Sequence, residues 1–89
     1  MGNIYNLKEK LIDALNYFDL AVGEMKDKDY SNAVDSFRKA KFELNEIRYW
    51  AKKCDESKIV FEIDKKLREL NLNVSFCLKR LNNKSDYSL

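Results

Sequence analysis

The residues of this chain that could do chemistry are carboxylates and thiols, and their spacing does not build a catalytic site. Carboxylates lie close together at Asp55-Glu56 and at Glu62 and Asp64. On a helix, side chains one or two residues apart do not converge on one point. The chain has no histidine, which removes the commonest acid-base residue and metal ligand. We therefore expect no enzyme activity, no cofactor and no bound metal.

The two cysteines, Cys54 and Cys77, fall on the apolar phase of the segments that contain them. In a helical hairpin, Cys54 would sit at the tip and Cys77 about 20 residues, or roughly 30 Å, along the return helix. A disulfide needs Cα atoms within about 7 Å. We expect two buried, reduced thiols, as is typical of cytoplasmic proteins.

Large apolar residues outside the main hydrophobic stripes are the most informative feature. Phe42 and Tyr49 are seven residues apart and therefore share a helix face. Phe61, Leu72 and Phe76 form a second stripe in the next apolar segment. Aromatic residues at exposed helical spacing are suitable anchors for a partner helix. The candidate partner-binding residues are thus Phe42, Tyr49, Phe61, Leu72 and Phe76.

Where these five residues point depends on how the helices are arranged. In one handedness of an antiparallel bundle, they line a groove between the second and third helices, away from the first. In the other handedness, they point outward separately. They could also simply widen the core, since isolated exposed apolar residues are normal.

Three segments with helical periodicity must position these residues. Apolar residues recur at i, i+3, i+4 and i+7, which predicts helices at about 4–27, 30–54 and 56–81. Polar residues separate the three segments. We expect Asp29 or Ser31 to be the N-cap of the second helix, and Asp55 or Ser57 the N-cap of the third. Connections this short make neighbouring helices antiparallel. The sequence predicts an all-α, up-down-up antiparallel three-helix bundle as one domain, 1–82, with a frayed tail, 83–89.

Composition supports this interpretation and limits the partners. The 89 residues are 45% hydrophobic and 36% charged, with no proline and two glycines, which favours helices over strands or disorder. The net charge of +2 comes from interleaved signs, so nucleic acid is not favoured as a partner. No apolar run is long enough to span a membrane. We expect a cytoplasmic protein.

The stretch from Ala14 to Leu44 resembles the first two helices of MIT (microtubule-interacting and trafficking) domains. The residues that carry the likeness, which extends from about Ile4 to Leu81, are Ala21, Asp29-Tyr30, Ala33, Phe37 and Ala40. The same residues are similar to a tetratricopeptide unit. The resemblance implies binding of short helical tails of membrane-remodelling filament proteins, one site being a groove between the second and third helices. The run Cys77 to Leu81 departs from the family, because it lacks the usual Ala-Glu after the arginine.

Helical HEPN domains share a similar pattern, but their nuclease motif needs a histidine that this chain lacks. The sequence thus predicts a module that binds a helical or extended peptide of a partner protein. One alternative is a homodimer that buries the same apolar residues. A second is a weak binder of nucleic acid or acidic surfaces through Lys39, Lys41, Lys52, Lys53, Lys65 and Lys66.

Overall fold

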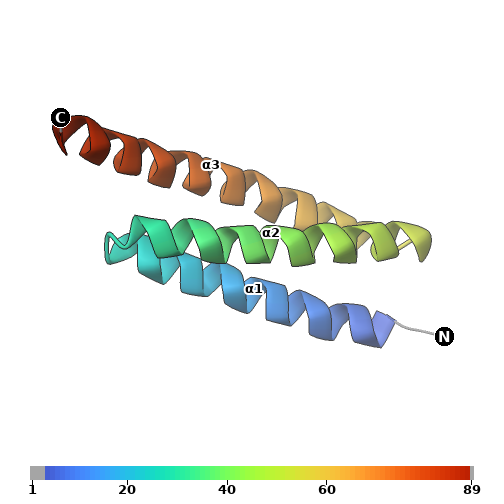
Figure 1. The fold of residues 1–89 in the computed structure, drawn as a ribbon. Helices are drawn as coiled ribbons and strands as arrows, with labels where there is room; N and C mark the ends of the chain where they lie inside the picture. The colour runs from blue at the N-terminus through green and yellow to red at the C-terminus, as the bar shows by residue number, and fades with distance from the viewer. Residues whose placement is uncertain (1–3, 89) are drawn as a thin grey trace.

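The computed structural model describes residues 4–88, and the side chains of residues 7–82, as three helices (Figure 1). They are α1 (Ile4–Lys26), α2 (Tyr30–Lys53) and α3 (Ser57–Ser88). No strand occurs between residues 4 and 88. Successive helices run antiparallel (Figure 1), so the predicted all-α, up-down-up three-helix bundle is confirmed.

Two tight connections at non-glycine residues reverse the chain. Lys28 (φ 65°) and Asp55 (φ 58°) both adopt the left-handed conformation that usually belongs to glycine. The next residue in each connection closes the preceding helix: the Asp29 amide donates to the Glu24 carbonyl (2.8 Å), and the Glu56 amide donates to the Ala51 carbonyl (2.8 Å). These bonds satisfy carbonyl groups that a helix end leaves unpaired.

The N-cap of α2 was predicted correctly, but the N-cap and the end of α3 were not. Asp55 or Ser57 was expected to cap α3, whereas the helix begins at Ser57 and the Glu56 carbonyl accepts its first bond, from the Val60 amide (3.1 Å). Asp29 is the N-cap of α2, as expected, although its carboxylate accepts a bond from the Asn32 side chain (2.8 Å) rather than from a backbone amide. The third helix was predicted to end at Leu81, followed by a frayed tail, but α3 continues to Ser88. No proline or glycine follows Leu81, so nothing in the local sequence stops the helix.

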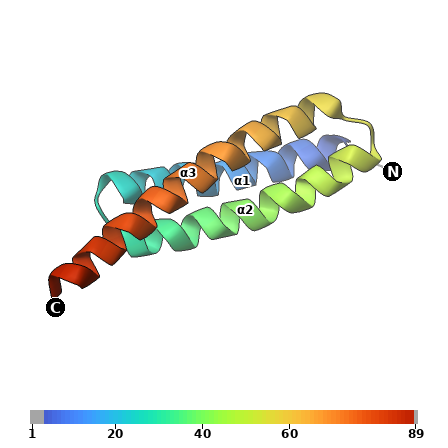
Figure 2. The same cartoon turned by 90° about the horizontal axis from the view of Figure 1, so that it is seen from above.

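The middle helix, α2, is the common partner of the other two. Both α1 and α3 pack along it, whereas α1 and α3 meet only slightly. One contact between them is the Lys66 ammonium, 4.6 Å from the centre of the Phe18 ring. The molecule measures 55 × 16 × 14 Å, and the end of α3 reaches past the connection between α1 and α2 (Figures 1 and 2).

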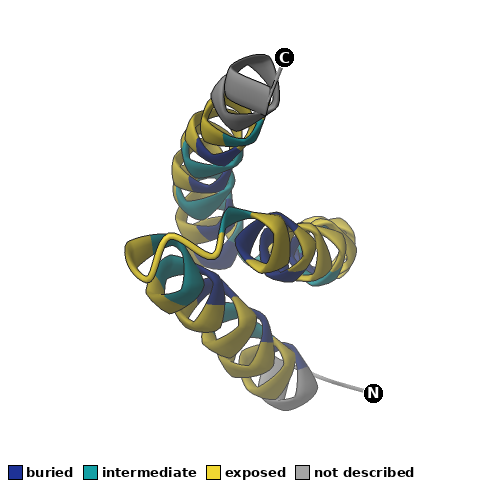
Figure 3. Cartoon of the chain, turned by 60° about the vertical axis from the view of Figure 1, so that its left-hand side comes forward, coloured by how far each residue is buried: buried dark blue, intermediate teal, exposed yellow. Residues whose placement is uncertain are grey.

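Small residues bring the helices of the core together. The five alanines at the centre of the packing are fully buried, and they are Ala14, Ala21, Ala33, Ala40 and Ala51. Between them the rings of Phe18 and Phe37 meet edge to face, with centroids 5.5 Å apart. The buried residues, dark blue in Figure 3, lie on the inner faces of the three helices. The apolar periodicity of the sequence therefore corresponds to one continuous core.

The two cysteines have different environments. Cys77 is fully buried, as predicted, and burial raises the pKa of its thiol. Cys54 was predicted to be buried as well, but it is exposed. It occupies the C-cap position of α2, three residues after Ala51, the last buried residue of that helix. Both thiols are free.

Candidate functional site

All five candidate partner-binding residues lie outside the core. Their exposed fractions run from 41% for Phe76 to 72% for Leu72. Two of them show the geometry well: Phe42 is two residues from the fully buried Leu44, and Leu72 is two residues from Leu70. Two residues correspond to about 200° of helical rotation, so these side chains point away from the core. Phe42 and Leu72 therefore do not widen the core, whereas Phe76 packs on Tyr30 at its margin.

On α2, the candidate residues form a small aromatic group near the end of the helix. The rings of Tyr49 and Trp50 meet edge to face, with centroids 5.2 Å apart. The Lys53 ammonium lies 5.3 Å from the centre of the Tyr49 ring. Phe42 lies two turns earlier on the same face and is 66% exposed. These contacts are within one helix and leave much of each aromatic surface open.

On α3, the candidate residues are spread along the helix. Phe76 lies across from the first residue of α2: its ring meets Tyr30 edge to face, with centroids 6.0 Å apart. The guanidinium of Arg80 lies 5.0 Å from the centre of the Phe76 ring. At the other end of the helix, Phe61 borders a shallow recess at the α2–α3 connection, together with Ala51 and other residues. Leu72 lies between these ends.

No aromatic contact joins the five residues into one cluster. Among the side chains described, 7–82, none links Phe42 or Tyr49 on α2 to Phe61 or Phe76 on α3. Tyr49 and Phe61 are both near the α2–α3 connection, yet Tyr49 does not border the recess that Phe61 lines. The candidate residues therefore form a group on α2 and a row on α3, and Phe76 of that row contacts Tyr30 of α2.

An ion pair that the sequence analysis did not identify lies between the two groups. The Nε atom of Arg48 on α2 donates to the Oδ1 atom of Asp64 on α3 at 2.6 Å, and the Nη2 atom lies 3.4 Å from Oδ2. Asp64 had been considered only as a neighbour of Glu62. Residues 16 apart in the chain carry no local pairing signal, so this contact could be found only from the packing of the helices.

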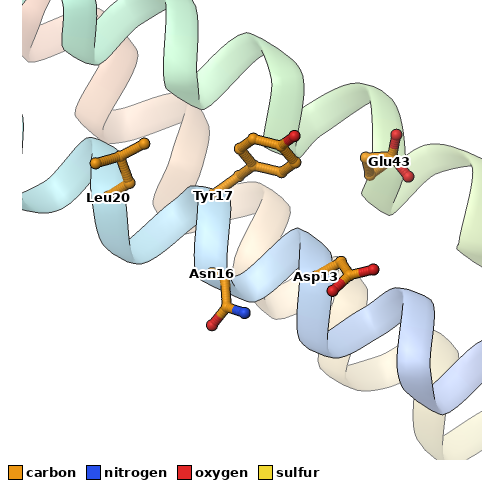
Figure 4. A pocket seen from close by; sticks show the side chains of 5 residues that line it. All are labelled: Asp13, Asn16, Tyr17, Leu20 and Glu43. Atoms are coloured by element: carbon orange, nitrogen blue, oxygen red, sulfur yellow. The ribbon is translucent and has the colours of Figure 1, made fainter.

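A second recess, between α1 and α2, was also missed. It is shallow, occupies about 400 Å³, and is lined by Asp13, Asn16, Tyr17, Leu20 and Glu43. Figure 4 shows the Tyr17 ring reaching toward α2, whereas Asn16 points away from it.

A cluster of side chains suited to a metal ion is not found in the described part of the chain. Within it, no group of three or more cysteine and carboxylate side chains could hold a metal ion. None of the helices between residues 4 and 88 combines the length and apolarity needed to cross a membrane. Comparison with known proteins adds no identification: no family model, curated protein or solved structure matches this chain. The resemblance to MIT domains therefore stays a prediction.

Proposed function

We propose that this protein is a non-enzymatic interaction module that binds a helical or extended peptide of a partner protein. The observation that carries the proposal is the exposure of Phe42, Tyr49, Phe61, Leu72 and Phe76 on a fold whose core is complete without them. Phe76 makes one contact between helices, with Tyr30, and the other four side chains are more than half exposed.

Burial of these side chains by a partner would be favourable. Removing a large apolar side chain from water stabilises an association by about 1.5–3 kcal/mol when its burial is complete. Binding energy at interfaces is concentrated in a few such residues, with aromatic residues enriched. Four of the five candidates are aromatic, and they are held on rigid helices, which reduces the entropy lost on binding.

The proposal is tested by selecting binders from a library of helical peptides and measuring their dissociation constants for the full chain. The test variant carries Phe42→Ser and Phe76→Ser. The control variant carries Ile12→Ser and Leu20→Ser, which remove residues of similar exposure, 58% and 53%, from α1. Far-ultraviolet circular dichroism checks that both variants fold. We expect the test variant to bind at least about tenfold more weakly and the control to bind like the parent chain. Equal binding by both folded variants would overturn the proposal.

Light scattering after size exclusion, over a wide range of concentrations, separates this function from self-association. A monomer leaves the apolar residues open to a partner. A dimer that dissociates in the Phe42→Ser, Phe76→Ser variant would show that a second copy covers them instead, because an interface depends on its buried anchors.

A further inference from the structure

The outer face of α3 carries a continuous stripe of exposed residues. Its first and last residues are 18 positions apart and are joined by steps of three or four, which equals five turns of an α-helix or about 27 Å. All of its residues are exposed, and together they define the α3 outer stripe: Phe61, Lys65, Arg68, Leu72, Phe76 and Lys79. It includes the three candidate residues of this helix, so their spacing belongs to a longer pattern.

The charge of the α3 outer stripe is of one sign. It contains three cationic side chains and no carboxylate. Two of the carboxylates along its edges are already engaged: Asp64 by Arg48 at 2.6 Å, and Glu69 by Lys66 at 3.3 Å. Glu62 is the third. The stripe therefore intersperses three apolar and three cationic residues along one helix.

The exposed aromatic pair on α2 is bordered by fewer cations. Glu46 lies four residues after Phe42 and three before Tyr49, so it shares their face. Lys39 lies three residues before Phe42, and the Lys53 ammonium lies 5.3 Å from the centre of the Tyr49 ring. Two cations and one carboxylate therefore border this pair. The α3 outer stripe contains three cations, and Glu69 at its edge is paired with Lys66, so it is the more cationic of the two surfaces.

We infer that the α3 outer stripe binds an acidic amphipathic helix of a partner protein. This inference rests on the proposed function and names the chemistry of the partner at that site. Side chains repeating every three or four residues along a straight helix match the side chains of a second helix. Carboxylates on such a helix would meet Lys65, Arg68 and Lys79, while its apolar residues would cover Phe61, Leu72 and Phe76.

The arrangement of the stripe favours a helix over a membrane or a nucleic acid. An interfacial membrane helix has a broad apolar face with its cations on the opposite side, but here Lys65 and Arg68 lie between Phe61 and Leu72. A nucleic-acid single strand needs a basic groove that follows its backbone, whereas this stripe is the exposed face of a single helix. Interspersed charged and apolar groups suit a partner that intersperses them in the same way.

The experiment titrates the full chain into a labelled 21-residue helical peptide and follows fluorescence anisotropy. The probe has leucine at the a and d positions of three heptads and glutamate at e and g. Two control peptides carry glutamine or lysine in place of every glutamate. Phosphatidylcholine–phosphatidylserine vesicles and a 20-nucleotide single strand are tested in parallel. We expect the acidic probe to bind most tightly, and its affinity to fall as salt is raised.

Matched variants connect the binding to the stripe. Lys65→Glu with Arg68→Glu is compared with Lys8→Glu with Lys10→Glu, which changes the net charge equally on exposed positions of α1. We expect the α3 variant to bind the acidic probe about tenfold more weakly and the α1 variant to differ by less than about threefold, because charge reversal within a contact opposes binding. Leu72→Ser with Phe76→Ser should weaken binding of both the acidic and the glutamine peptide.

The outcomes separate the inference from the function on which it depends. If the acidic and glutamine peptides bind equally and Leu72→Ser with Phe76→Ser weakens both, the interaction module stands and the acidic partner is ruled out. If neither pair of α3 substitutions changes the binding of any peptide, the inference about α3 fails, and the function then depends on Phe42 and Tyr49 of α2. The protein could instead bind the vesicles or the nucleotide strand most tightly and lose that binding in Lys65→Glu with Arg68→Glu. The ligand of the stripe would then be a membrane or a nucleic acid, and the acidic helix would be ruled out.

Discussion

The Nε atom of Arg48 and the Oδ1 atom of Asp64 lie 2.6 Å apart and tie the second half of α2 to the first half of α3. The hydrogen bond from Arg48 lowers the pKa of the Asp64 carboxyl below its ordinary value, and the same bond raises the pKa of the guanidinium. Both side chains keep more than a third of their surface exposed. Water therefore screens the pair, and its contribution to stability is small.

The ion pair makes stability depend on pH in one direction. Because the folded-state pKa of Asp64 is depressed, its contribution is fully present above the unfolded-state pKa of about 3.9 and is lost as pH falls through the folded value. We expect Arg48→Gln to raise the pKa of Asp64 toward the ordinary value, as followed by carboxyl NMR titration. The small stability difference between the two proteins should vanish in acid. An unchanged Asp64 titration would show that the pair does not form in solution.

Truncation of two phenylalanines five residues apart on α2 should change the free energy of unfolding by very different amounts. Phe37 is fully buried against Phe18, whereas Phe42 is 66% exposed. Phe37→Ala leaves a cavity and should cost about 3–5 kcal/mol. Phe42→Ala should stay within about 0.5 kcal/mol of the parent chain. Urea denaturation measures both values. A large loss for Phe42→Ala would place that ring in the core and contradict its assignment to a binding surface.

The two thiols should differ in reactivity by position. Cys54 is exposed at the end of α2, whereas Cys77 is fully buried and burial raises its pKa. Since the thiolate is the reactive form, iodoacetamide at neutral pH should modify Cys54 in the folded protein and Cys77 only after unfolding in urea. Mass spectrometry of peptides gives the site. Equal labelling of both residues in the native protein would show that the middle of α3 opens readily.

The left-handed residues in the two connections can be relieved by glycine. A residue with a side chain costs about 1–2 kcal/mol in this conformation, and glycine removes that cost. Glycine also makes the unfolded chain more flexible, which offsets part of the stabilisation. We expect Lys28→Gly and Asp55→Gly each to raise the free energy of unfolding by up to about 1 kcal/mol. Lys39→Gly, at an exposed position inside α2, should instead lower it by about 1 kcal/mol. A loss at all three positions would argue against the left-handed conformations.

The sequence predicted those parts of the fold that depend on local pattern. Apolar residues spaced like Phe37, Leu44 and Ala51 settle which face of a helix is buried, and all three are fully buried. The end of α3 was mispredicted because the hydrophobic pattern stops at Leu81, whereas a helix can continue without a hydrophobic pattern. The loss of amphipathic spacing indicates where packing ends. It does not indicate where hydrogen bonding along the backbone ends.

The candidate site was only partly predictable, for a geometric reason. Exposure of Phe42 and Leu72 follows from their position two residues from the core stripe. Whether residues on two helices meet depends on crossing angle and rotation, which the periodicity of one helix does not determine. The same limit explains why the Arg48–Asp64 pair and the recess beside Tyr17 were not anticipated.

The central position of α2 has a consequence for how the chain reaches this structure. Almost all tertiary contacts join helices that are neighbours in sequence, across connections of three residues. The entropy of closing such short loops is small, and domains rich in local contacts fold in microseconds to milliseconds. Either hairpin, α1–α2 or α2–α3, can form first and offer α2 as a template for the remaining helix. We therefore expect rapid folding with more than one route to the native state.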